Sequence, residues 1–144
     1  MDTKEYLGQA YRIDQRINSK IEQIAALRDL ATKATSALGS EPVSGTRNPQ
    51  RLQDVIDKIV DMERELNDDI DALVDLKREI MRVIKGVENK EYQTLLEMRY
   101  LSFMTWERIA VELGYSIQQI YRIRNRALEK IAVPEKMIGN VSRC

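Results

Sequence analysis

The feature that most constrains this chain is a pair of long heptad stripes separated by a break rich in glycine and proline. In residues 3–38, apolar side chains recur at alternating spacings of four and three, the period of a helix that packs along another helix. This stripe consists of Tyr6, Ala10, Ile13, Ile17, Lys20, Ile24, Leu27, Ala31, Ala34 and Leu38, widened by Ile21 and Leu30. Lys20 is its polar member, and we interpret it as a side chain that reaches solvent from the edge of the stripe.

Residues 49–85 repeat the pattern in a second long helix. Its stripe consists of Leu52, Ile56, Ile59, Glu63, Leu66, Ile70, Leu73, Lys77, Ile80 and Ile84, with Val55, Met62, Leu76 and Val83 on a neighbouring row. The break at residues 39–49 cannot continue a helix, and Asn48 as N-cap with Pro49 as first helical residue restarts one. Because each stripe needs a partner, residues 1–86 are predicted to form an antiparallel coiled-coil hairpin that drives self-association or binds a partner.

Residues 87–133 predict three short helices. The first is capped by Asn89 and runs to about Leu101, and the second is capped by Thr105. Gly114 is expected at the left-handed position that ends the second helix, and Ser116 with Gln119 has the spacing of a capping box for the third. The remaining residues, 134–144, show no period and are expected to form a loosely ordered tail. The predicted fold class is therefore all-α.

The third of these helices has one apolar and one polar face. Its apolar side chains are Ile117, Ile120, Ile123, Ala127, Leu128 and Ile131, and its outward ones are Gln118, Gln119, Arg122, Asn125, Arg126 and Glu129. Two short helices joined by a tight turn, the second of which displays amides and arginines, are typical of a helix-turn-helix that binds duplex DNA. In its first two turns, Gln118 and Gln119 can pair with adenine and Arg122 with guanine.

Other residues of this unit are candidates for phosphate contacts. They are Thr105, Arg108, Ser116, Asn125, Arg126 and Lys130, of which Thr105 and Ser116 stand where helix N-termini offer amide hydrogens. Arg124 projects near the apolar face. We expect it to extend to solvent or to pair with Glu97 or Glu112 rather than to touch DNA.

Several segments of this unit resemble region four of bacterial sigma factors, the module that reads the promoter −35 element. They are Glu97-Met98-Arg99-Tyr100-Leu101, Thr105-Trp106-Glu107-Arg108-Ile109-Ala110, Leu113-Gly114-Tyr115-Ser116 and residues 120–131. The resemblance covers residues 90–132 and implies that Ile117, Gln118, Gln119, Tyr121 and Arg122 are the base-contacting positions. Gln118, Gln119 and Tyr121 replace charged residues of housekeeping sigma factors, so −35 specificity is not carried over. The whole layout is similar to small phage transcription regulators of the ArpU and RinA type.

Composition limits the other classes of function. The 23 basic and 23 acidic residues balance, so nucleic acid is expected to meet a local basic face rather than the whole surface. The chain has no histidine and no motif of a nucleotide-binding or hydrolytic enzyme, so we expect no catalysis, cofactor or metal. The carboxylates of the second long helix, including Asp68, Asp69 and Asp71, are interpreted as a solvated acidic face. No apolar run of membrane length and one cysteine, Cys144, indicate a cytoplasmic protein without an internal disulfide.

Together these patterns predict a phage or prophage transcription regulator that binds double-stranded DNA sequence-specifically, as a homodimer through its hairpin. One alternative is a DNA-packaging oligomer resembling a small terminase subunit. Another is a protein-interaction module that binds RNA polymerase without contacting DNA. A large ring would favour packaging, and a dimer would favour regulation.

Overall fold

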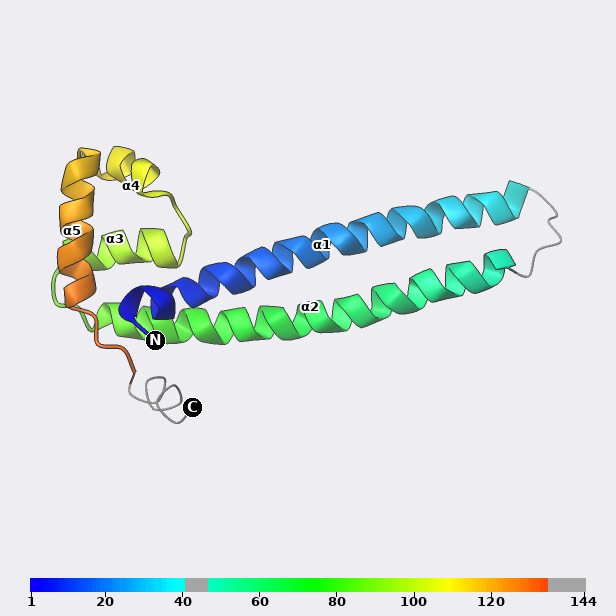
Figure 1. The fold of residues 1–144 in the computed structure, drawn as a ribbon, viewed down its shortest axis with the longest axis horizontal. Helices are drawn as coiled ribbons and strands as arrows, with labels where there is room; N and C mark the ends of the chain where they lie inside the picture. Colours follow the sequence, from blue (N-terminus) through cyan, green and yellow to red (C-terminus); the bar gives the residue numbers. More distant parts are fainter. Residues whose placement is uncertain (41–46, 135–144) are drawn as a thin grey trace. The chain divides into compact units, whose positions relative to one another are not determined.

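The described part of the chain is entirely helical. The structure, a computed structural model, describes residues 1–40 and 47–134, with side chains for 1–36 and 49–134. Within them lie α1 (Thr3–Ser40), α2 (Arg47–Lys85), α3 (Lys90–Tyr100), α4 (Trp106–Leu113) and α5 (Ile117–Glu129), without a strand (Figure 1). The all-α prediction is confirmed. Most of the expected break and tail, with Cys144, lies outside the described residues, and α2 begins at Arg47, two residues before Pro49.

The chain divides into two compact units. The first, which we call the terminal unit, combines Met1–Ile13 with Leu73–Cys144, and the second, the hairpin unit, is Asp14–Ala72. The terminal unit therefore holds α3, α4 and α5 together with the first turns of α1 and the last turns of α2. The hairpin unit contains only segments of α1 and α2 among its described residues.

In the hairpin unit, α1 and α2 run antiparallel, as the heptad stripes predict. Arg28 pairs with Glu63 and Lys20 with Asp69, so rising numbers in α1 meet falling numbers in α2. Ile24 of α1 packs with Ile59 and Met62 of α2 in a buried apolar core, against which Leu27, Val55 and Leu66 pack, and Ile17 of α1 is also buried. Mutual burial of these two faces is what stabilises helices that carry so much charge elsewhere.

The buried row of α2 differs from the expected one. Ile56 and Ile70 were assigned to the stripe, but their side chains are 40% and 39% exposed. The inner positions are instead Val55, Met62 and Asp69. Asp69 was expected to belong to a solvated acidic face, but its side chain is buried. On α1, the expected widening of the stripe is also wrong, because Ile21 and Leu30 are about half exposed, at 48% and 50%.

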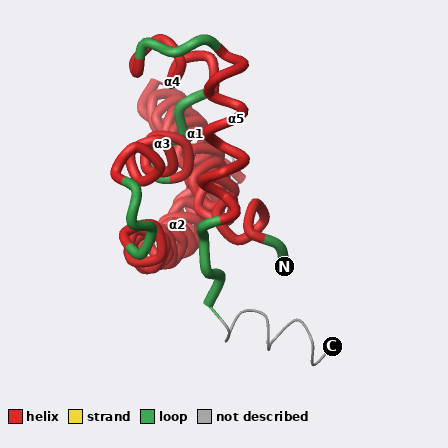
Figure 2. The backbone as a smooth tube through the Cα atoms, turned by 90° about the vertical axis from the view of Figure 1, so that its left-hand side faces the viewer, coloured by secondary structure: helices red, strands yellow, loops and turns green. Residues whose placement is uncertain are grey.

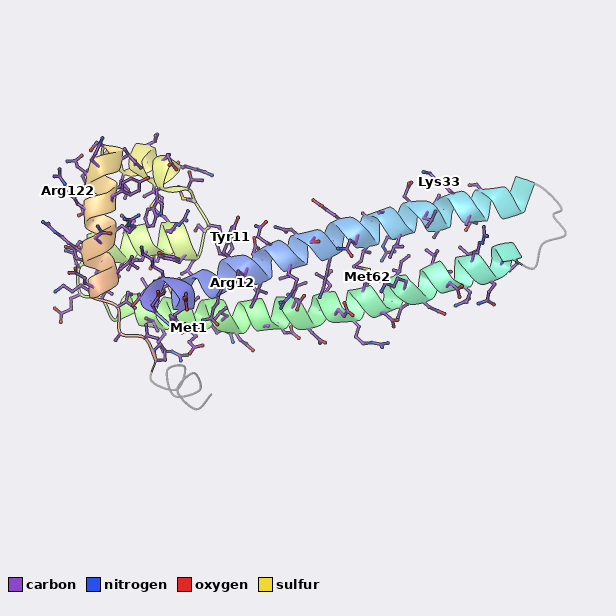
Figure 3. The ribbon with its side chains drawn as sticks, in the orientation of Figure 1. Met1, Tyr11, Arg12, Lys33, Met62 and Arg122 are labelled. Atoms are coloured by element: carbon purple, nitrogen blue, oxygen red, sulfur yellow. The ribbon has the colours of Figure 1, made fainter. Side chains whose placement is uncertain are left out.

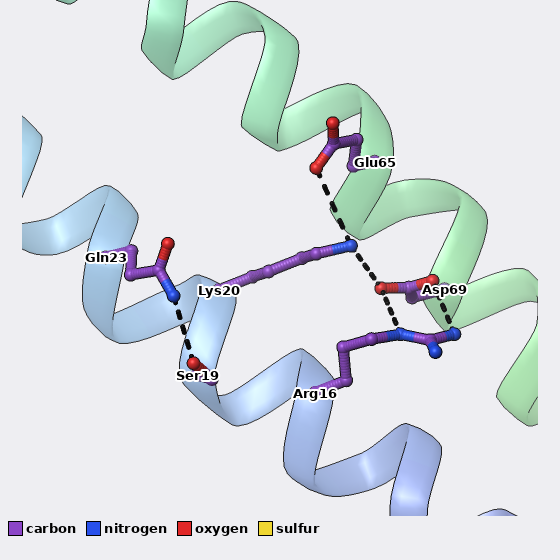
Figure 4. Close-up of polar contacts among 6 residues, drawn as sticks. All are labelled: Arg16, Ser19, Lys20, Gln23, Glu65 and Asp69. Atoms are coloured by element: carbon purple, nitrogen blue, oxygen red, sulfur yellow. Dashed lines mark hydrogen bonds and ion pairs between the residues drawn. The ribbon is translucent and has the colours of Figure 1, made fainter.

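Asp69 lies on the inner side of α2 because two basic side chains of α1 form ion pairs with its carboxylate (Figure 4). Its Oδ2 accepts from Lys20 Nζ at 2.6 Å, and Arg16 donates from Nε to Oδ2 at 3.2 Å and from its terminal nitrogen to Oδ1 at 3.1 Å. Lys20 Nζ also lies 3.7 Å from Glu65 Oε2. The expectation that Lys20 extends to solvent is therefore wrong, because its ammonium group pairs with the Asp69 carboxylate between the two helices. These contacts lower the pKa of the Asp69 carboxyl, chiefly through the hydrogen bonds from Lys20 and Arg16.

The core of the terminal unit joins all five helices. Its fully buried large side chains are Tyr6 and Leu7 from α1, Ile80 and Ile84 from α2, Leu95 and Leu96 from α3, Ile109 from α4 and Ile120 from α5. The helix α5 packs against both α3 and α4, and it runs across α3 (Figures 1 and 2). This core fixes α5 by its apolar face, which determines which of its side chains remain free to meet a ligand.

Candidate nucleic-acid interface

The local geometry of α4 and α5 follows from three residues at their ends. Thr105 caps α4, its Oγ1 accepting from the Arg108 backbone N–H at 3.2 Å. Gly114 ends α4 with φ +75°, a left-handed conformation that glycine adopts without strain. Ser116 begins α5 with a full capping box: its Oγ accepts from Gln119 N at 3.2 Å, and its N–H donates to Gln119 Oε1 at 2.9 Å. All three assignments made from the sequence are confirmed.

The two faces of α5 are separated as the sequence predicts. Ile120 and Ala127 are buried, and Ile117, Ile123, Leu128 and Ile131 are half-buried. Every predicted outward side chain is exposed: Gln118, Gln119, Arg122, Asn125, Arg126 and Glu129. Figure 3 shows Arg122 on the side of α5 turned away from α3. The polar face is thus open, on a helix that its apolar face holds in place.

The candidate base-contacting residues differ in how free their side chains are. The Gln118 side chain is exposed and forms no hydrogen bond with any side chain or backbone group that the structure describes. Gln119 instead uses its amide oxygen in the capping box, so only its amide nitrogen remains. Bidentate pairing with adenine needs both groups of a glutamine, so Gln118 is the better placed of the two.

Tyr121 and Arg124 form a stacked pair at the edge of this face. The guanidinium carbon of Arg124 lies 4.8 Å from the Tyr121 ring centroid and 5.7 Å from that of Trp106. Its Nε also donates to Asn125 Oδ1 at 3.1 Å. Of the two expected arrangements, pairing with Glu97 or Glu112 does not occur, because two aromatic faces attract the Arg124 cation and no described carboxylate forms an ion pair with it.

The candidate phosphate contacts divide in the same way. Arg126 of α5 and Lys130, the C-cap of that helix, are exposed and form no ion pair with a carboxylate among the described residues. Arg108 faces Glu112 at 3.9 Å in an exposed pair, which reduces the charge it offers. The Thr105 and Ser116 hydroxyls are engaged in their caps, so their contribution to an anion would come from the hydroxyl hydrogens and neighbouring backbone amides.

The described residues contain no cluster of three or more histidine, cysteine, aspartate or glutamate side chains that could together hold a metal ion. No described helix combines the length and apolar character that a membrane crossing requires.

Comparison with known proteins gives a family and no further relative. A family model described as "protein of unknown function (DUF1492)" matches residues 33–132, which is more than half of the chain and includes α3, α4 and α5. Neither the curated proteins nor the solved structures contain a match to this chain.

Proposed function

We propose that this chain, which belongs to the DUF1492 family, binds double-stranded DNA through the polar face of α5 and regulates transcription of a phage or prophage. The observation that carries the proposal is the pairing of a buried and an open face on one short helix. Ile120 and Ala127 anchor α5, while Gln118, Arg122 and Arg126 stand exposed on its other side. A helix held in this way can enter a major groove without giving up its own core.

Different side chains of this face would contact the DNA bases and the DNA phosphates. Gln118 and Arg122 lie one turn apart in the first half of α5, where a recognition helix enters the groove. Arg126 lies one turn further and Lys130 another, so their charges would follow the phosphates along the groove wall. The resemblance of residues 90–132 to region four of sigma factors supports the same orientation.

We propose further that the protein acts as a homodimer through the hairpin unit. Arg28 of α1 contacts Glu63 of α2 at 2.8 Å in an exposed ion pair. Because the helices are antiparallel, Ile21 and Ile70, each one heptad from this pair, occupy equivalent positions, and both are substantially exposed. Ile56 and Val60 of α2 are also exposed, at 40% and 46%. Apolar side chains at heptad spacing on the outside of a helical hairpin favour a second copy as their cover. A dimer would present two α5 helices to paired half-sites.

Selection from random DNA duplexes tests the base-reading part of this proposal. The wild-type protein is expected to enrich one short sequence. Gln118→Ala should lose the preference at one position of that sequence while still retaining DNA on the resin, because its amide contributes discrimination rather than charge. Glu129→Ala is the matched control, an exposed residue of the same helix face that should leave the enriched sequence unchanged. Failure of the wild-type protein to enrich any sequence would contradict the proposal.

A further inference from the structure

A cavity in the terminal unit is walled by cations and aromatic rings. Its volume is about 460 Å³, within the range of small-molecule sites. Four basic side chains line it, Lys4 and Arg12 from α1, Arg99 from α3 and Arg124 from α5. Among the described residues, no aspartate or glutamate belongs to the lining. The cavity therefore has the character of an anion site, and it is made by residues that lie up to 120 positions apart in the sequence.

The four cations are not neutralised by the fold. None of them has a carboxylate oxygen within 4.0 Å among the residues that the structure describes. Arg99 donates to the Met104 carbonyl at 3.0 Å and Arg12 to the Glu5 carbonyl at 3.5 Å, contacts that orient a guanidinium without cancelling its charge. Like charges facing one cavity repel, so an anion placed among them would be stabilised by all of them.

Aromatic side chains supply the rest of the wall. The guanidinium of Arg99 lies 4.9 Å from the Trp106 ring centroid, on which Arg124 also converges, and the Tyr100 ring meets that of Trp106 edge-to-face at 6.3 Å. Across the lining, Tyr11 meets Phe103 edge-to-face at 5.6 Å. Sites that bind a nucleotide combine aromatic rings, which contact the base, with cations, which pair with the phosphate.

The α1 side of the cavity is shaped by helical spacing. Lys4, Gly8 and Arg12 follow one another at intervals of four and so share a face of α1, beside Tyr11 (Figure 3 labels Tyr11 and Arg12). A β-carbon added at Gly8 would meet no atom of the described residues within 4 Å, so the absence of a side chain there enlarges the cavity rather than relieving a clash. The two cations thus flank an open gap into which a ligand can reach.

We propose that this cavity binds a nucleotide, with the phosphate held by Lys4, Arg12, Arg99 and Arg124 and the base beside the aromatic side chains of the lining, near Trp106. The ligand is either a free nucleoside phosphate or the terminal nucleotide of a nucleic-acid strand, two sources of the same chemistry. The cavity is distinct from the polar face of α5, because its lining contains none of Gln118, Arg122 and Arg126. Thr105, a candidate phosphate contact at the start of α4, is the residue that it shares with the proposed DNA interface.

Trp106 provides a direct readout, because it is the one tryptophan of the chain. We expect adenosine 5′-monophosphate to change its fluorescence saturably. Adenosine and inorganic phosphate, which each satisfy half of the site, should bind at least about tenfold more weakly. A 5′-phosphorylated oligonucleotide identifies the source: tighter binding than the monophosphate assigns the site to a strand end, and equal or weaker binding assigns it to the free nucleotide.

Paired variants separate the cavity from general charge effects. The double variant Lys4→Gln/Arg12→Gln changes two exposed side chains and should weaken nucleotide binding by about tenfold or more, with circular dichroism unchanged. The matched control, Lys58→Gln/Arg64→Gln, removes the same charge from exposed positions of the hairpin unit and should bind as the wild type does. No saturable change at Trp106 with either ligand, or equal losses in the two double variants, would overturn the proposal. Arg126→Ala should leave nucleotide binding intact, so the outcome is independent of the α5 proposal.

Discussion

At the scale of single residues, the side chain with most influence on the hairpin unit is Asp69. It is the buried charged residue of the described core, and it stands opposite Lys20, the polar member of the α1 stripe. A carboxylate in such a position is tolerated only because Lys20 and Arg16 satisfy both of its oxygens. The pair also selects one register, because sliding either helix by a heptad would leave both charges among apolar side chains.

Removing the Asp69 charge should therefore destabilise the protein clearly. We expect Asp69→Asn to lower the free energy of unfolding by about 2 kcal/mol, less than the loss of a fully buried pair because Arg16 is 55% exposed. The matched control is Glu63→Gln, which breaks the exposed pair with Arg28 and should cost below about 0.5 kcal/mol. Urea unfolding of the two variants measures both, and equal losses would contradict the role given to Asp69.

The same contacts predict how stability depends on pH. The folded pKa of Asp69 is lowered, so its contribution is present above the unfolded pKa, near 3.9, and is lost as pH falls through the folded value. Unfolding free energy should fall below about pH 4 more steeply in the wild type than in Asp69→Asn, which has no carboxyl to protonate there. Parallel curves for the two proteins in urea unfolding at pH 2 to 5 would show that Asp69 does not carry this dependence.

At the scale of helices, much of the fold could be predicted from the sequence. Local chemistry determines where α3, α4 and α5 begin and where α4 ends. The N-caps are Asn89, Thr105 and Ser116, and Gly114 is the left-handed residue that ends α4. The inner row of α2 could not be assigned in this way. Two neighbouring rows carry apolar residues, and a count of apolar side chains favours Ile70 over Asp69. The choice depends on a charge from the other helix, Lys20, which no local pattern contains.

Two glycine substitutions should have opposite effects, because their backbones differ. Gly114→Ala places a β-carbon on a residue with φ +75° and should destabilise by about 1 kcal/mol, although nothing lies within 4 Å of it. Gly8→Ala lies inside α1, also without a neighbour within 4 Å, and should stabilise by about 0.5–1 kcal/mol. Thermal unfolding monitored by circular dichroism compares them. A stabilising Gly114→Ala would contradict the left-handed turn between α4 and α5.

At the scale of the whole molecule, the sequence could predict the character of α5 but not the cavity of the terminal unit. The polar face of α5 lies on one continuous helix, so its periodicity shows it. The cavity combines Lys4 and Arg12 with Arg99 and Arg124, and the terminal fold is what brings them together. In the sequence, Trp106 is simply part of the apolar face of α4.

Self-association belongs to this scale. We expect the wild-type protein to have the mass of a dimer in solution, and the double variant Ile21→Gln/Ile70→Gln to have the mass of a monomer, because both isoleucines are exposed in the hairpin unit. Substituting Val111→Gln, an 83% exposed valine of α4, is a control that should leave the mass unchanged. Sedimentation equilibrium measures all three. A wild-type monomer would contradict the dimer, and a large ring would favour a packaging role.

The most direct test of the central claim, that the polar face of α5 binds duplex DNA, is a salt titration of Arg122→Ala and Arg126→Ala on the selected duplex and on random duplex. Arg126→Ala should weaken binding to both duplexes alike and reduce the slope of log affinity against log salt by about one unit. Arg122→Ala should lose roughly 1–3 kcal/mol on the selected duplex and much less on the random one. Equal losses for the two variants on both duplexes would contradict the assignment of Arg122 to bases. Unchanged binding in both variants would contradict DNA recognition by α5 altogether.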